Sequence, residues 1–156
     1  FIIFYLMWFP LMFLSLLYFL LKDKDAFIDL CFLMFTGMSI SLLIYVIAPN
    51  GLDLRVEIAS DNLFAWMVRM IQTVDDPTNV CPSIHCQSSA CMALAFSSST
   101  LTEKRPGLKV LAWVWAALIC ASTVFTKQHS IVDVVCGLAV AFVWVPVLYR
   151  PHRKNS

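Results

Sequence analysis

Charged side chains are scarce in this sequence. Asp, Glu, Lys and Arg make up only 13% of its 156 residues, whereas hydrophobic residues make up 60%. A soluble globular domain carries about 25% charged residues. The few charges cluster between long apolar runs, a pattern that is typical of membrane proteins. We therefore expect an integral membrane protein rather than a soluble domain.

Several other features are absent. No basic tract occurs and the net charge is +1, so nothing predicts a nucleic-acid partner. No cysteines form a CxxC pair, which argues against a zinc site built from cysteines. Four of the six cysteines fall in predicted membrane helices, where small packing residues are the simpler interpretation: Cys31, Cys91, Cys120 and Cys136. Repeats, low-complexity tracts and a recognisable second domain are also missing from the sequence.

The sequence opens at Phe1, without a Met and already inside an apolar run. That run lacks the basic n-region and the small-residue cleavage site of a signal peptide. We therefore expect a fragment whose natural N-terminus is missing.

Five apolar segments approach the roughly 20 residues that a membrane-spanning helix needs. They are Phe1–Leu21, Ala26–Ala48, Ser88–Leu101, Leu108–Phe125 and Ile131–Tyr149. The third is short, and we expect it to begin near Pro82, because proline suits the first turn of a helix. Its many Ser and Ala residues permit close helix contacts and place it at the bundle centre. The predicted fold is an all-α, polytopic membrane helical bundle over residues 1–149, with a basic cytoplasmic tail at 150–156.

The long polar stretch Pro49–Cys81 contains a further predicted helix. Apolar residues recur there at helical spacing, and Asp61 could cap the start. We interpret Asp61–Val74 as an amphipathic helix, lying either at the membrane surface or against the bundle.

Positive charges predict the orientation in the membrane. With five spans, one face receives eight Lys and Arg residues and should be cytoplasmic: Lys22, Lys24, Lys104, Arg105, Lys109, Arg150, Arg153 and Lys154. The other face receives only Arg55, Arg69 and Lys127. Phe1 then lies outside, so a missing upstream helix would give six spans.

Two histidines and a carboxylate fall near the extracytoplasmic face. His129 and Asp133 are four residues apart at a helix start and would share a helix face. Asp133 could accept the proton of one ring nitrogen and leave the other nitrogen free to attack. A purely structural His–Asp pair that closes the helix end is the alternative. An ionisable residue one turn into a membrane helix is costly, which favours a functional role.

His85 follows Pro82 and Ser83 at another predicted helix start. Free backbone N–H groups and the positive end of the helix dipole suit a phosphate there, and Ser83 adds a hydroxyl donor. His85 could protonate a leaving oxygen, although a lone histidine at a helix start is often only a cap. Arg55 and Lys127 are the candidate phosphate-binding cations on the same face.

These motifs resemble those of the type 2 phosphatidic acid phosphatase superfamily, the histidine-dependent membrane phosphatases and phosphotransferases. The family pattern has three blocks, K-x6-RP, PSGH and SR-x5-H-x3-D. Residues 82–85 match the second block, and Ser122, His129 and Asp133 match the third. Arg55 alone matches the first.

The sequence departs from this pattern in each block. Ala48 stands in place of the lysine, Thr123 in place of an arginine, and Val56 and Ile84 in place of a proline and a glycine. Two phosphate-binding cations of the family are therefore missing. We hypothesise that Lys127 replaces one of them.

The resemblance covers about residues 45–140 and implies a six-helix bundle with the site at its extracytoplasmic end. It implies that His129 is a nucleophile forming a phosphohistidine, that Asp133 orients His129 and that His85 is the general acid. Neither a metal nor another cofactor is implied. We expect the phosphate ligands to be Arg55, Ser83 and Ser122, together with Lys127, which is our own hypothesis and not part of the family pattern.

The leading interpretation is a metal-independent phosphoric monoester or diphosphate hydrolase acting on a lipid phosphate or prenyl diphosphate in the bilayer. A lipid phosphotransferase is the first alternative, because the pattern also resembles the branch that includes sphingomyelin and inositol-phosphorylceramide synthases. There an alcohol, not water, would resolve the phosphohistidine. The missing cations motivate a further alternative, an inactive membrane scaffold. A metal site built on the two histidines and the aspartate is the least favoured.

Overall fold

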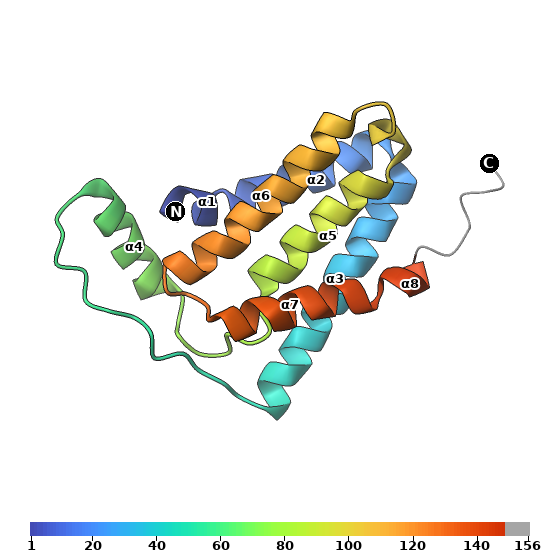
Figure 1. Ribbon diagram of the computed structural model, residues 1–156. Helices are drawn as coiled ribbons and strands as arrows, with labels where there is room; N and C mark the ends of the chain where they lie inside the picture. Colours follow the sequence, from blue (N-terminus) through green and yellow to red (C-terminus); the bar gives the residue numbers. More distant parts are fainter. Residues whose placement is uncertain (149–156) are drawn as a thin grey trace.

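A bundle of helices makes up the computed structural model, which describes residues 1–148 (Figure 1). Within that range the only other regular feature is an isolated bridge between Gly51 and Thr78. The predicted all-α class is confirmed, whereas the predicted tail at 150–156 lies outside the described residues. The helices are α1 (Ile2–Leu6), α2 (Trp8–Lys22), α3 (Lys24–Ile47), α4 (Leu63–Val74), α5 (Ile84–Ser98), α6 (Pro106–Phe125), α7 (Ile131–Val143) and α8 (Val145–Leu148), with a 3-10 turn at Thr100–Thr102.

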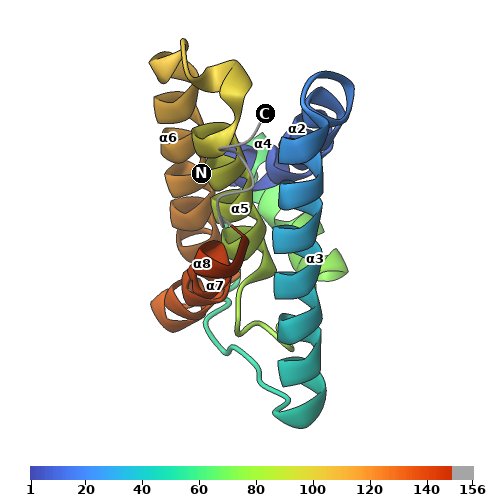
Figure 2. The same cartoon turned by 90° about the vertical axis from the view of Figure 1, so that its right-hand side faces the viewer.

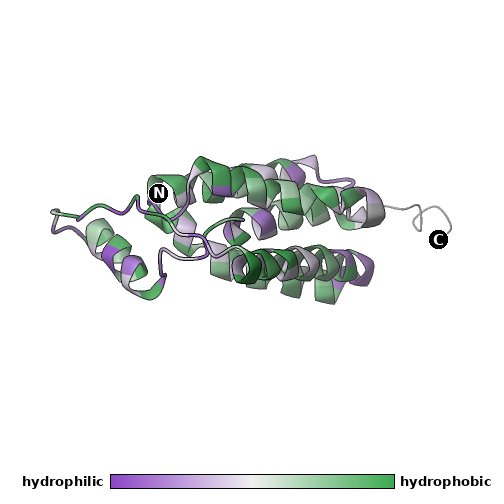
Figure 3. Ribbon diagram, turned by 90° about the horizontal axis from the view of Figure 1, so that it is seen from below, coloured by the Kyte–Doolittle hydropathy of each residue, from purple (hydrophilic) through white to green (hydrophobic). Residues whose placement is uncertain are grey.

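Three helical segments are long and apolar enough to cross a membrane: Ile2–Lys22, Lys24–Ile47 and Pro106–Phe125. Hydrophobic residues predominate along the helices of the bundle (Figure 3). Large apolar side chains on these three segments are exposed, including Phe13, Leu43 and Val114. The apolar composition of the chain and the apolar outer surface of its helices thus identify it as a membrane protein.

The other two predicted spans form shorter helices than expected. α5 has 15 residues and α7 has 13. At about 1.5 Å per residue, α5 is about 22 Å long, shorter than the roughly 30 Å hydrocarbon core of a bilayer. α7 ends at Val143 because Pro146 has no N–H to donate to the preceding turn; α8 follows the break.

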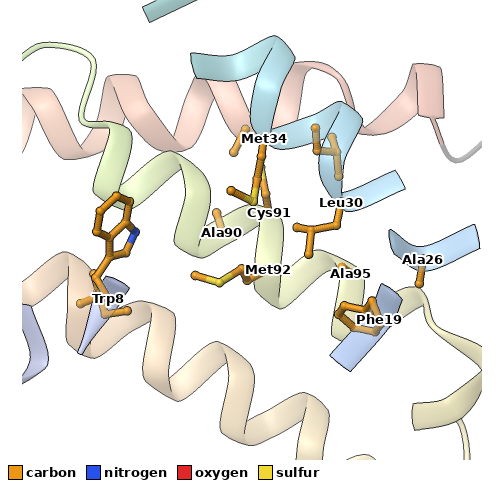
Figure 4. Packing of buried hydrophobic residues seen from close by; sticks show 12 residues of the cluster. Trp8, Phe19, Ala26, Leu30, Met34, Ala90, Cys91, Met92 and Ala95 are labelled. Atoms are coloured by element: carbon orange, nitrogen blue, oxygen red, sulfur yellow. The ribbon is translucent and has the colours of Figure 1, made fainter. Parts of the chain in front are cut away.

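α5 is the central helix, as its small residues predict. It packs against α2, α3, α6 and α7 (Figures 1 and 2). Every residue from 86 to 93 is buried, and Ala90, Cys91 and Ala95 lie in the apolar core with Trp8 and Leu30 (Figure 4). The helix begins at Ile84, close to Pro82 as predicted, and the Ser83 hydroxyl accepts the N–H of Cys86 at 3.4 Å.

α7 approaches the start of α5 very closely. The backbone N–H of Ser83 donates to the carbonyl of Asp133 at 3.0 Å. One turn further along α7, a Cβ on Gly137 would lie only 2.4 Å from the carbonyl oxygen of Ser83. Only glycine therefore allows this approach, which brings the first turns of α5 and α7 together.

α4 lies at the edge of the bundle beside α1, at the end of the extended segment 49–62 (Figure 1). Its cap is Asn62, whose side chain accepts the N–H of Ala65 at 2.9 Å. The prediction that Asp61 caps this helix is therefore wrong. Asp61 instead pairs with Arg69 at 3.4 Å across the first turns. Much of the apolar surface of α4 is exposed, with Trp66 at 53% and Val74 at 83%.

Replacing Gly137 with alanine should push α7 away from α5, because the new methyl group would meet backbone atoms that cannot rotate away. We expect Gly137→Ala to lower the free energy of unfolding by about 1–3 kcal/mol, the usual cost of overpacking. Gly107→Ala is the control, since no atom lies within 4 Å of a Cβ there. Denaturant unfolding in detergent measures both, and equal stabilities of the two variants would refute this view of the α5–α7 contact.

Candidate active site

The two candidate histidines come from different elements. His85 is the second residue of α5, and His129 lies in the turn between α6 and α7. In that turn the backbone N–H groups of Gln128 and His129 both donate to the carbonyl of Thr123, at 3.0 and 3.1 Å. Lys127 adopts a φ of 59°, in the left-handed region. The chain therefore reverses sharply, and His129 turns toward the start of α5.

The structure brings the two imidazole rings into contact. His129 Nε2 lies 3.4 Å from His85 Nδ1. One of these nitrogens must carry the hydrogen while the other accepts it, so the pair can share a single proton along this line. Aromatic rings cover the other sides of His85, with centroids 4.8 Å away for Tyr5 and 4.4 Å away for Trp8.

Asp133 lies beside His129 but does not hydrogen bond to it. The distance from Asp133 Oδ2 to His129 Nδ1 is 3.8 Å, which is too long for a hydrogen bond. Asp133 instead completes a capping box, in which its Oδ2 accepts the Ser130 N–H at 2.6 Å and Ser130 Oγ accepts the Asp133 N–H. His129 Nδ1 is buried and makes no hydrogen bond to the described residues. A small rotation of the ring would bring the two groups within hydrogen-bonding reach, as often happens when a catalytic site closes on its substrate.

The surroundings of His129 favour the neutral ring. The residue lies outside the candidate spans, and burial lowers its pKa below the ordinary value because the charged form is desolvated. The charge of Asp133 and the carbonyl of Val80 oppose this shift without reversing it. A neutral imidazole has a free lone pair and is the nucleophilic form.

A small polar cavity of about 120 Å³ opens beside the two rings. Arg55, from the extended segment, is the cation in its lining among the described residues. The guanidinium donates to Gln128 Oε1 at 2.7 Å, to the Gln72 carbonyl at 3.0 Å and to the Asp75 carbonyl. These bonds hold Arg55 at the cavity despite its position on an irregular segment.

Three predicted phosphate ligands do not line this cavity in the described part of the chain. Ser83 is buried and caps α5, and Ser122 is buried and donates to the Ile119 carbonyl at 2.7 Å. Lys127 is exposed at the turn. Of the seven predicted site residues, the structure therefore groups His85, His129 and Arg55 around the cavity, with Asp133 directly behind His129.

Sequence reasoning missed three residues of the site. Gln128 lines the cavity and contacts Arg55, and its place beside His129 in the motif could have indicated it. Asp75 also lines the cavity, although an Asp-Asp-Pro sequence by itself is typical only of a turn. Tyr5 donates to Asp75 Oδ2 at 2.5 Å; no sequence signal distinguishes it within its apolar run.

Across residues 1–148, no three or more His, Cys, Asp and Glu side chains gather in an arrangement suited to a metal ion.

Comparison with known proteins identifies one family. A family model described as the PAP2 superfamily matches residues 64–156, more than half of the chain. The match contains His85, His129 and Asp133 and begins after Arg55. No curated protein and no solved structure matches the chain.

The lowered pKa of His129 predicts a pH-dependent stability. An unfolded histidine titrates near pH 6.5, whereas folded His129 titrates at lower pH. Between these two values the unfolded state binds more protons, so the free energy of unfolding should fall as the pH falls. Melting temperatures in detergent at about pH 7.5 and about pH 5.5 test this. The decrease should be smaller in His129→Gln, and an unchanged decrease would argue against the neutral buried ring.

Proposed function

We propose that this chain, which belongs to the PAP2 superfamily, hydrolyses a lipid phosphate or prenyl diphosphate through a phosphohistidine on His129. Members of the superfamily are phosphatases and related phosphotransferases of lipid-like phosphates. The observation that carries this proposal is the 3.4 Å approach of His129 Nε2 to His85 Nδ1 beside a cavity lined by Arg55. Two imidazoles and a guanidinium supply a nucleophile, an acid and a counter-charge.

In the first proposed step, neutral His129 attacks phosphorus through Nε2. A nitrogen–phosphorus bond forms while the ester oxygen–phosphorus bond breaks, and His85 gives its proton to the leaving oxygen. Burial lowers the pKa of His85 to about 4 in the free protein, so His85 must take up this proton when the anionic phosphate binds beside the ring. Water then attacks the phosphohistidine, loses a proton to His85 and releases phosphate. The 3.4 Å gap is too narrow for a phosphoryl group between the rings, so substrate binding must separate them.

We propose that the charges of Asp133 and Arg55 stabilise both steps of the reaction. Asp133, 3.8 Å behind His129, favours the positive charge that the ring acquires when Nε2 is bonded to phosphorus. Arg55 faces the phosphoryl oxygens, and its bonds to Gln128 and to two backbone carbonyls preorganise the guanidinium. Preorganised charges of this kind are a major source of catalytic stabilisation.

A lipid phosphotransferase is the second candidate, and one observation favours it. Asp75 and Asp76 line the same cavity as Arg55. Two carboxylates would repel a doubly charged phosphate monoester but would tolerate a singly charged phosphodiester whose headgroup carries hydroxyl or ammonium groups. A lipid alcohol would then take the place of water in the second step.

We also propose that the cavity opens on the extracytoplasmic side. The positive-charge count supports this side, because Lys104 and Arg105 follow the far end of α5, whereas His85 lies at its start. A multi-pass arrangement with the site outside follows from that count.

His129→Ala should abolish turnover and labelling of the protein by phosphate-labelled substrate, because no phosphohistidine can form. His85→Ala should slow phosphoenzyme formation by about 10²–10⁴-fold, the usual contribution of a general acid.

Purified protein is assayed with lipid phosphates, prenyl diphosphates and phosphodiesters, each with and without EDTA. Free phosphate indicates hydrolysis, and a new phospholipid indicates transfer. Turnover by His129→Ala, or EDTA inhibition reversed by zinc, would eliminate the mechanism, and no product from any substrate would favour the inactive scaffold.

The two candidate cations should differ in how their effects respond to salt. Arg55→Met should lower kcat/KM by about 10²–10³-fold, as expected when a preorganised transition-state contact is lost. We propose that exposed Lys127 attracts the phosphate from solvent, so Lys127→Met should cost more than about twofold at low ionic strength and almost nothing at high salt. Kinetics of both variants at two salt concentrations measure this. A Lys127→Met enzyme that matches wild type at low salt would show that this lysine replaces no missing cation.

A further inference from the structure

A second cavity lies next to the polar one and has a different character. It is an apolar groove of about 450 Å³ between α4 and the helices α1 and α2. Leu6 and Phe9 line one wall, and Trp66, Met70 and Val74 of α4 line the other. The volume lies within the roughly 300–1,000 Å³ of small-molecule pockets.

The groove ends at the candidate active site. His85 and Asp75 line the groove and also line the polar cavity. Tyr5, a third lining residue of the groove, donates its hydroxyl to Asp75 at this junction. An amphiphile that filled both spaces would therefore place its polar end against the histidines and its apolar part along α4.

We infer that this groove binds the hydrocarbon chain of the substrate and that α4 sets the preferred chain length. The inference rests on the proposed function, since a phosphate must occupy the polar cavity. It assigns a role to apolar side chains on both walls of the groove that the bundle leaves uncovered. Trp66 of α4 is 53% exposed, and Phe9 of α2, on the opposite wall, is 65% exposed. A hydrocarbon chain between them would contact both walls.

A different apolar cavity provides a comparison. It has a volume of about 270 Å³ and lies between α2, α5 and α6, where Leu111 and Trp115 help to line it. It shares no lining residue with the polar cavity. A chain bound there would have no continuous path to a phosphate beside His129, so the groove along α4 is the one that fits a substrate.

The test compares chain-length preference in two matched variants. Met70→Trp narrows the groove and Leu111→Trp narrows the comparison cavity, at side chains that are 46% and 55% exposed. The measured quantity is the kcat/KM for hexadecyl phosphate divided by that for butyl phosphate, in detergent micelles. Met70→Trp should lower this ratio by about tenfold or more, because several chain carbons lose their contacts. Leu111→Trp should leave it within about twofold of wild type.

A second measurement on the wild-type protein does not depend on turnover or on either variant. An alkyl phosphate with a diazirine in its chain is photo-crosslinked to the protein, and the labelled peptides are identified by mass spectrometry. Labels should fall in residues 63–74 and 5–9, and excess hexadecyl phosphate should suppress them.

The outcomes separate this inference from the proposed function. Phosphate release with an unchanged ratio in Met70→Trp and labels only on α5 or α6 would overturn the groove and leave the hydrolase intact. Labels in 63–74 without any phosphate release would retain the groove and overturn the proposed reaction. A ratio that falls only in Leu111→Trp would move the chain to the comparison cavity and also refute the inference.

Discussion

One backbone contact holds the candidate site together: the Ser83 N–H donates to the Asp133 carbonyl, and Gly137 lets α7 lie against that same serine. Ser83 precedes α5 and Asp133 is in the first turn of α7, so each residue of the contact lies within four residues of one histidine. With the two helix starts joined in this way, the 3.4 Å approach of the imidazole rings follows from short, capped connections. The caps matter because His85 is the second residue of α5 and His129 lies two residues before α7. A displacement of α7 along α5 would therefore separate the rings before it disturbed either helix.

The cavity beside the two imidazole rings contains one arginine and two carboxylates, whereas a phosphate site usually presents mainly positive charge. Arg55 comes from an irregular segment, and Gln128 together with carbonyls near the end of α4 holds its guanidinium in place. The carboxylates of Asp75 and Asp76 line the same cavity, while Ala48 and Thr123 occupy positions where the resemblance leads one to expect cations. Arg55 and Asp75 are half-buried and Asp76 is exposed, so solvent screens the interactions among these charges in part. Whether this cavity accepts a phosphate monoester or a phosphodiester therefore depends on how the negative charges of Asp75 and Asp76 are offset when the substrate binds.

The sequence predicts the fold class and the meeting of His85 with His129 and Asp133, because apolar runs and short motifs are local signals. It overestimates the helix at α5, since hydropathy alone cannot show that a bundle centre is shorter than a span. Asp61 and Asn62 are equally good caps by residue type, and the choice depends on the path of the preceding loop. Tyr5 could not be predicted, because its partner Asp75 lies 70 residues away and the pairing exists only after α1 packs beside α4. Ser83 and Ser122 match the family motif, but their hydroxyl groups hydrogen bond to backbone groups and do not line the cavity.

His85 occupies the boundary between two environments. One edge of its ring meets His129 in the polar cavity, and its faces meet Tyr5 and Trp8, beside the apolar groove. In a lipid phosphate, a single oxygen joins the hydrocarbon part to phosphorus, and this oxygen leaves when the ester is cleaved. A general acid for that oxygen must therefore lie where the apolar and polar spaces meet, within hydrogen-bonding distance of the bridging oxygen. His85 alone among the histidines of the described chain lines both spaces, so the position that suits the proposed acid is also the position where the proposed chain-binding groove meets the polar cavity.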